Sequence, residues 1–144
     1  MSVWGRQVSE ANAVLMGKTK LAVVKVISEV SRSVIQGTPV DKGMLINNWY
    51  AANTSPSKRK NKSRDPSGKK SIGRVAKALR RLKLGQTFYL TNNLPYAAVV
   101  EYGRYPNPSR AKNPKTRNGF SKQAPAGMMR LGLRRALQKI RSAP

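Results

Sequence analysis

The chain has 144 residues, and its 29 lysines and arginines against 5 aspartates and glutamates give a formal net charge of +24. The absence of cysteine and histidine excludes thiol chemistry, Ser-His-Asp triads and ordinary zinc sites. Because the five acids are spread thinly along the chain, carboxylate metal clusters and glycosidase pairs are not expected either, so we expect a protein that is not an enzyme and has no cofactor.

The first expected element is a long helix over Ser9–Gln36. Apolar residues recur there at the spacing of one helix face: Met16, Val23, Ile27, Val30 and Val34. Pro39 cannot continue this helix. Further apolar residues lie off the main stripe, among them Val14, Val24 and Ile35. A small sheet cannot readily cover them all, so part of the helix is expected to face a neighbouring subunit.

Three strands are expected after this helix, over Met44–Asn53, Thr87–Asn92 and Tyr96–Tyr102. The last two are joined by Asn93-Leu94-Pro95, which suits a tight hairpin. Aromatic residues of these strands are expected to pack in the core rather than to form a base-stacking platform: Trp49, Tyr50, Phe88, Tyr89 and Tyr96.

Two shorter helices complete the expected elements. A basic helix over Ser71–Leu84 carries Val75 and Leu79, and a C-terminal helix covers Gly127–Arg141. The apolar face of the C-terminal helix is expected to comprise Met129, Leu133, Ala136 or Leu137, and Ile140. The sequence therefore predicts an α+β fold with a long N-terminal helix, a small antiparallel sheet, a C-terminal helix and two long basic loops, in one domain over residues 1–144.

The two basic loops lie at about 55–70 and 104–122. Seven cations face one acid, Asp65, in the first, and six cations face none in the second. A charge this large opposes compaction and is typical of chains that lie against a polyanion. The cations expected to contact a polyanion or a neighbouring ring are Lys58, Arg59, Lys60, Lys62, Arg64, Lys69, Lys70, Arg110, Lys112, Lys115 and Arg117; the alternative is a merely solvated surface. Residues 57–70 carry almost no apolar side chain, so their removal is expected to cost little stability.

Three segments resemble the signature of a known family. Thr38-Pro39-Val40-Asp41-Lys42-Gly43-Met44-Leu45, followed by Asn48-Trp49, is similar to TPVDTGxLxxSW. Asn92-Asn93-Leu94-Pro95-Tyr96-Ala97 and Val100-Glu101-Tyr102-Gly103 are similar to NxxPYAxxVEYG, and Ala124-Pro125-Ala126-Gly127-Met128-Met129-Arg130 is similar to APxGMxR. In this order they resemble the tail-completion (neck) proteins of long-tailed bacteriophages, with Lys42 and Asn48 departing from the usual threonine and serine.

Ten residues of these motifs are expected to have structural roles: Pro39, Asp41, Gly43, Trp49, Tyr96, Glu101, Tyr102, Gly103, Pro125 and Gly127. Asp41 can accept backbone N–H bonds in a turn, and Gly43 can adopt a positive φ. A contact of this turn with a neighbouring subunit is the alternative. Glu101 is expected either to pair with an arginine such as Arg130 across a subunit interface, or to pair within one subunit or lie at a solvated strand end.

The resemblance implies a non-catalytic virion protein, assembled in the host cytoplasm, that forms a ring at the head–tail junction around the DNA channel. The implied partners are further copies in a homohexamer, the adjacent neck and tail proteins (head-closure or stopper protein, tail terminator and tape measure), and genomic DNA contacted without sequence preference. The residues alone leave open a sequence-independent nucleic-acid-binding protein. No apolar run reaches the ~20 residues of a membrane helix, and no secretory signal is visible, so no membrane partner is expected.

Overall fold

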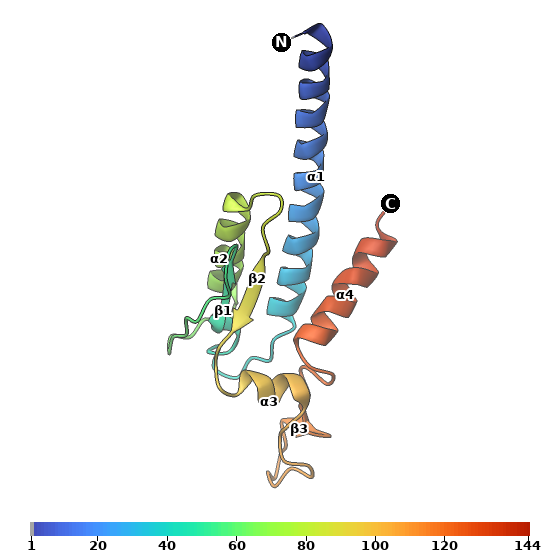
Figure 1. Ribbon diagram of the computed structural model, residues 1–144. Helices are drawn as coiled ribbons and strands as arrows, with labels where there is room; N and C mark the ends of the chain where they lie inside the picture. Colours follow the sequence, from blue (N-terminus) through green and yellow to red (C-terminus); the bar gives the residue numbers. More distant parts are fainter. Residues whose placement is uncertain (1) are drawn as a thin grey trace.

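A computed structural model describes residues 2–144 of the chain. Its elements are α1 (Val3–Gln36), the 3₁₀ turn η1 (Ile46–Asn48), β1 (Trp49–Ala52), α2 (Lys69–Arg81), β2 (Tyr89–Asn92), α3 (Ala97–Tyr102), β3 (Thr116–Arg117), β4 (Phe120–Ser121) and α4 (Met129–Ser142). The predicted α+β fold is confirmed: a long N-terminal helix, a small antiparallel sheet and a C-terminal helix (Figure 1). Within residues 2–144, no helix combines the length and apolar character needed to cross a bilayer.

The helix α1 is longer than predicted and has two different halves. It begins at Val3, where the Ser2 hydroxyl accepts the Gly5 N–H at 3.0 Å as an N-cap. From Ser2 to Ala22 no side chain is buried, and Figure 1 shows this part extending beyond the rest of the subunit. We call residues 3–22 the projecting half of α1. Residues 23–36, the packed half, belong with everything that follows to the body of the subunit.

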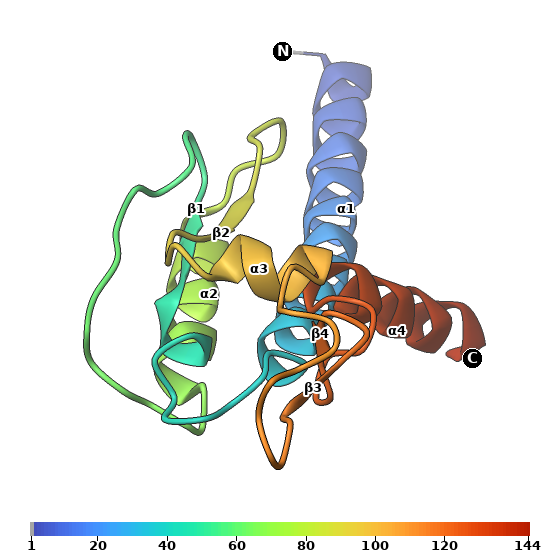
Figure 2. The ribbon, with the colours of Figure 1, turned by 90° about the horizontal axis from the view of Figure 1, so that it is seen from below.

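The packed half of α1 lies between α2 and α4, as Figure 2 shows from below. Ile35 and Trp49 are among the most deeply buried side chains of the core. Gly132 allows α4 to cross α1 closely, because a Cβ there would lie 2.7 Å from the Val34 Cα. The Ser33 hydroxyl donates to the Gly132 carbonyl at 2.7 Å, which fixes this crossing.

The sheet has two antiparallel strands, β1 and β2, paired from Trp49↔Asn92 to Ala52↔Tyr89. Both are shorter than predicted, and β1 begins only at Trp49 because residues 44–48 turn and form η1 before the chain becomes extended. The second hairpin, β3–β4, lies inside the basic segment 104–122 and was not predicted.

The prediction of a strand over Tyr96–Tyr102 is wrong, and so is the hairpin at Asn93-Leu94-Pro95. The Ala97 N–H donates to the Leu94 carbonyl at 3.0 Å, which starts the helical turns of α3. Short apolar runs do not distinguish helix from strand by periodicity. The buried residues of α3 are Ala97, Val100 and Glu101, spaced as on a helix.

The expected apolar face of α4 is also wrong in part. Gly132 and Ala136 are the buried residues of this helix, whereas Met129 and Leu133 are 44% and 45% exposed. Leu137 is similarly exposed. Close approach to α1 through small residues leaves these larger side chains outside the core as an exposed apolar ridge.

Candidate polyanion-binding cleft

One face of α2 is a stripe of cations. Lys70, Arg74, Lys77 and Arg81 are spaced by four, three and four residues, which places them on the same side of the helix. The stripe spans ~16 Å at the rise of an α-helix. The opposite side of α2, with Val75 and Leu79, is buried in the core. Burial of the apolar side therefore fixes the direction of the cations.

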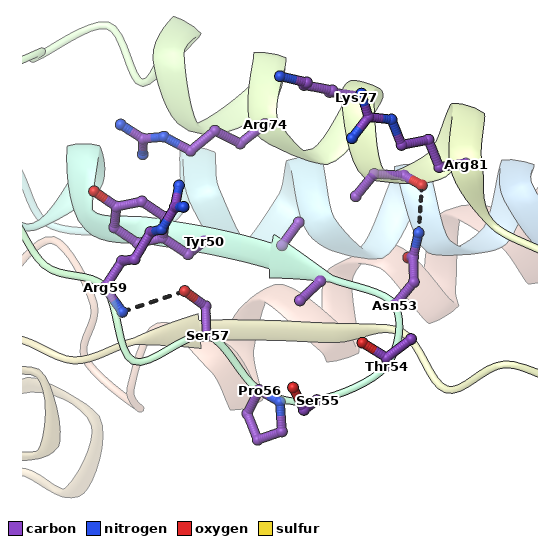
Figure 3. Close-up of a pocket in the computed structure, with 13 residues that line it drawn as sticks. Tyr50, Asn53, Thr54, Ser55, Pro56, Ser57, Arg59, Arg74, Lys77 and Arg81 are labelled. Atoms are coloured by element: carbon purple, nitrogen blue, oxygen red, sulfur yellow. Dashed lines mark hydrogen bonds between the residues drawn. The ribbon is translucent and has the colours of Figure 1, made fainter.

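This stripe borders a cleft of about 600 Å³ between α2 and the segment that follows β1. The cleft is lined by four cations and by no acidic residue: Arg59, Arg74, Lys77 and Arg81. In Figure 3, Arg59 reaches from the segment after β1 toward Tyr50, while the other three come from α2. Within residues 2–144, none of these four side chains has a carboxylate partner. The cleft is thus a concentrated positive potential open to solvent.

Arg74 is the fixed member of this group. Its guanidinium lies 4.4 Å from the centre of the Tyr50 ring, within the range of a cation–π contact. It also donates to the carbonyls of Asn47 at 2.6 Å and Trp49 at 3.1 Å. Most of its donors are used inside the subunit, so Arg59, Lys77 and Arg81 are the cations free to meet a ligand.

The basic segment after β1 is held in place by buried amides. The Asn61 N–H donates to the Asn48 Oδ1 at 2.8 Å, and the Asn48 Nδ2 donates back to the Asn61 carbonyl at 3.0 Å. Asn47 Nδ2 likewise donates to the Ser63 carbonyl at 3.1 Å. Asn47 and Asn48 have no exposed area. Without the segment, the Asn48 Oδ1 and the Asn47 Nδ2 would lose all of their hydrogen-bond partners, so the expectation that its removal costs little stability is revised.

The other end of the segment is fixed by β2 and the residue after it. Asn93 Nδ2 donates to the carbonyls of Ser57 at 2.7 Å and Arg59 at 3.0 Å. The Thr91 hydroxyl donates to the same Ser57 carbonyl at 3.1 Å. These bonds take up main-chain atoms and leave the cationic side chains exposed. The predicted cations Lys58, Lys60, Lys62 and Arg64 thus lie on an anchored segment beside the cleft.

Lys69 and Lys70 belong to the first turn of α2 rather than to the loop. Asp65 stabilises this turn, because its carboxylate accepts the Lys70 N–H at 2.8 Å. Hydrogen bonds from the Ser67 hydroxyl and then from the Lys70 amide lower the pKa of Asp65 below its ordinary value. The single acid of the first basic segment is therefore used to begin the helix that carries the stripe.

The second basic segment does not join the cleft. Figure 1 shows β3 and its loops below α3, whereas α2 lies above it, and Figure 2 shows β3 and β4 apart from α2. Lys115 pairs with Asp41 at 2.8 Å, and its hydrogen bond lowers the pKa of that carboxyl. Asp41 thus binds a side chain across the fold. The other predicted cations of this segment, Arg110, Lys112 and Arg117, are exposed.

Glu101 caps α4 within its own subunit. Its carboxylate accepts the N–H groups of Met128 and Met129, each at 2.8 Å, and the Arg130 Nε at 3.0 Å. Arg130 also donates to the Glu101 carbonyl. Gly127 has φ +88°, and a Cβ there would lie 2.6 Å from that carbonyl oxygen. Of the three alternatives for Glu101, the structure has the pair with Arg130 within the subunit.

Other motif residues also have structural roles. Trp49 Nε1 donates to the Thr38 hydroxyl at 2.8 Å, and this hydroxyl donates to the Val34 carbonyl at the end of α1. Gly43 has the predicted positive φ, +86°, and a Cβ there would lie 2.4 Å from the Pro66 nitrogen. Gly103 also has a positive φ and lies against the Phe120 ring.

The tyrosines and prolines of the motifs are less enclosed. Burial raises the pKa of Tyr96, which with Pro39 lines a second cavity of about 340 Å³ beside α3. Tyr102 and Pro125 are exposed.

The residues of α2 and β1 that complete the cleft were not predicted from the sequence. Arg74, Lys77 and Arg81 were available as a signal, because their spacing with Lys70 repeats along one helix face. Tyr50 was expected in the core but lines the cleft. Asn53 had no sequence signal: its Nδ2 donates to the Ala78 carbonyl at 2.8 Å, while its Oδ1 is buried and has no partner within residues 2–144.

The cleft can bind anionic groups by charge and by hydrogen bonds from flexible side chains, without a base-reading arrangement. Comparisons of the chain with models of protein families, with curated proteins and with solved structures find no match. Its function is therefore inferred from its own residues and their geometry.

Proposed function

We propose that this chain is a structural, non-catalytic ring subunit at the head–tail junction of a long-tailed bacteriophage. One observation carries the proposal: the three segments that resemble the tail-completion signature, far apart in sequence, meet through residues in or beside the motifs. Three accidental matches would have no reason to be in contact. A family signature, in contrast, is expected to mark residues that hold one structural unit together.

The contacts between the segments are direct. The Asn92 Nδ2 of the second segment donates to the Leu45 carbonyl of the first at 2.9 Å. Glu101 of the second segment caps the helix that begins in the third. Val40 of the first exchanges two hydrogen bonds, at 2.9 and 3.0 Å, with Gln123, which immediately precedes the third.

In this role the partners are further copies of the chain, adjacent neck and tail proteins, and the genomic DNA that passes through the ring. The six-fold symmetry of phage tails makes a homohexamer the expected assembly. The cations of the cleft supply a contact to DNA phosphates or to acidic surfaces of adjacent rings. DNA in a channel must slide, so a contact without sequence preference suits this position.

The test combines electron microscopy of the purified chain with complementation of a phage that lacks its own tail-completion protein. Rings of uniform diameter and restored head–tail joining are the expected results. Failure to join heads to tails, with the protein folded and expressed, would overturn the proposal.

The basic cleft favours a second candidate, a sequence-independent nucleic-acid-binding protein. Such a protein needs a positive surface and no ring. Monomers that coat DNA evenly in the same micrographs would favour this candidate over the first.

A further inference from the structure

The projecting half of α1 carries an apolar stripe that its own subunit does not cover. Trp4, Val8, Ala11 and Leu15 recur every three or four residues and therefore share one face of the helix. Trp4 is 77% exposed and Leu15 is 62% exposed. Val3, Val14 and Leu21 flank this face and are exposed as well. We call these residues the α1 stripe.

The α1 stripe is not an extension of the face that packs in the core. At 3.6 residues per turn, Trp4, Val8, Ala11 and Leu15 are centred about 130° around the helix from its core-facing residues, which are Val23, Val24, Ile27, Val30, Val34 and Ile35. Glu29 lies three steps of seven residues after Val8, and therefore on the same face of α1 as the stripe. Its carboxylate forms an ion pair with Lys139 of α4 at 2.6 Å. In the body, α4 reaches this face at Glu29, and beyond the end of α4 the apolar face is uncovered, as the helix arrangement in Figure 1 shows.

A second apolar surface lies in the body, as a groove of about 670 Å³ between α1, α4 and the start of β2. Ile27 and Val30 form one wall, Phe88 and Leu90 another, and Leu133 belongs to the exposed ridge of α4. The two charged residues that line the groove, Glu101 and Arg130, are paired with each other. The groove therefore offers apolar contact without an unpaired charge.

Charge favours a second copy of this chain as the occupant. Two chains of net charge +24 repel each other, so copies meet best where the net positive charge is small. The projecting half, residues 3–22, carries Arg6, Lys18 and Lys20 against Glu10, which is a net +2 of the chain's +24. An acidic protein or a polyanion would find most of its charge partners on the body, which carries the other +22, rather than beside the stripe. The stripe and the groove are thus two surfaces through which copies of this cationic chain can join.

We propose that the α1 stripe of one copy packs into the groove of the next copy. The two surfaces differ, so each copy uses its stripe on one side and its groove on the other. Such a head-to-tail contact closes into a ring when its rotation allows it. This inference rests on the proposed ring function, for which it names the contact between subunits. The projecting half, 20 residues from Val3 to Ala22, extends ~30 Å at 1.5 Å per residue, which is long enough to reach across a neighbouring subunit.

The test uses two variants that damage opposite sides of the same contact. Leu15→Glu places a charge on the stripe and Leu133→Glu places one at the groove; both side chains are largely exposed, so the fold is expected to persist. Each variant alone should be monomeric in light scattering. An equimolar mixture should form dimers only, because one intact stripe meets one intact groove. Ser9→Glu, on the other side of the projecting half, is the matched control and should assemble as the parental protein does.

Cross-linking gives a second readout, since the chain has no cysteine of its own. Leu15→Cys mixed with Leu133→Cys should give mixed disulfide dimers under oxidation. Dimers of Leu15→Cys alone, in preference to mixed dimers, would indicate stripe-to-stripe pairing and overturn the inference. Normal assembly of Leu133→Glu would also overturn it. Either result would overturn only the proposed contact between subunits, provided that the parental protein still forms rings and joins heads to tails. If the parental protein does not join heads to tails, the proposed function is overturned.

Discussion

The projecting half of α1 and the body differ in what surrounds their apolar residues, although one continuous helix runs through both. In the body, Ile35 and Trp49 are enclosed by the chain's own side chains. In the projecting half, residues of the same chemical type, such as Trp4 and Leu15, face solvent. Apolar area stabilises a fold only when it is removed from water. Residues of the body therefore act on folding, while those of the projecting half are available for contacts between molecules.

The body and the projecting half also differ in their charge. The cations of the cleft lie on the body, on α2 and the anchored segment after β1, whereas the projecting half carries a net charge of only +2. Substitutions of the same chemical kind in the two regions should therefore have different effects. Four matched pairs test this difference.

The two tryptophans give the largest expected contrast. Trp49 is 1% exposed and its indole donates to Thr38, so Trp49→Ala leaves a cavity and a broken hydrogen bond. The free energy of unfolding should fall by about 3–5 kcal/mol, measured by urea denaturation. Trp4→Ala should leave it unchanged in the monomer. A large loss of stability from Trp4→Ala would show that the projecting half is packed within its own subunit.

The second pair compares asparagines. Asn48→Ala removes the side chain that satisfies both main-chain groups of Asn61, and should lower the free energy of unfolding by about 1–3 kcal/mol. Asn12→Ala, on the exposed projecting half, should have almost no effect. Because the anchored segment would loosen, limited proteolysis should cut Asn48→Ala between residues 55 and 68 first. Equal resistance of both variants would indicate that other bonds are enough to hold the segment.

The overall fold could be predicted from the sequence because helix periodicity and strong terminators were present. The long helix, the strands β1 and β2 and the C-terminal helix all depend on such local patterns, whereas the pairing of β1 with β2 was not predicted. The segment Tyr96–Tyr102 failed, because a short apolar run fits a strand and a helix equally well. The face of α4 failed for a different reason: Gly132 and Ala136 are buried by a close helix crossing, which apolar periodicity alone does not indicate.

The candidate site was predictable only in part. The cations after β1 were visible as a charge run, but the amides of Asn47 and Asn48 that anchor this segment come from a distant turn. The stripe on α2 was readable by spacing once the helix was assigned. Its position opposite Arg59 depends on tertiary packing and could not be read from local sequence. For the same reason, the sequence suggested an ion pair between Glu101 and Arg130 but did not indicate whether it forms within one subunit or between two.

The third pair concerns the cleft. The double variant Lys77→Ser and Arg81→Ser should weaken DNA binding about ten-fold at low salt and reduce the salt slope by about 2, since two phosphate contacts are lost. The control, Lys18→Ser with Lys20→Ser on the projecting half, removes the same charge and should change binding much less. Fluorescence anisotropy with duplexes of two unrelated sequences measures both effects. Equal losses of affinity in the two double variants would mean that DNA binding depends only on the total charge of the protein.

The smallest expected effect is on the pH dependence of stability, which Asp65→Asn should change and Glu10→Gln should not. Hydrogen bonds from Ser67 and the Lys70 amide lower the folded-state pKa of Asp65 below its unfolded value. A lowered pKa stabilises the folded state above the unfolded pKa, and this contribution disappears as the pH falls through the folded pKa. Thermal midpoints of the parental protein should therefore decline below about pH 4, and Asp65→Asn should decline less over the same interval. Glu10→Gln, on the exposed projecting half, should follow the parental curve. If Asp65→Asn and the parental protein decline in parallel, the carboxylate does not stabilise the first turn of α2, and the basic stripe is positioned by core packing alone.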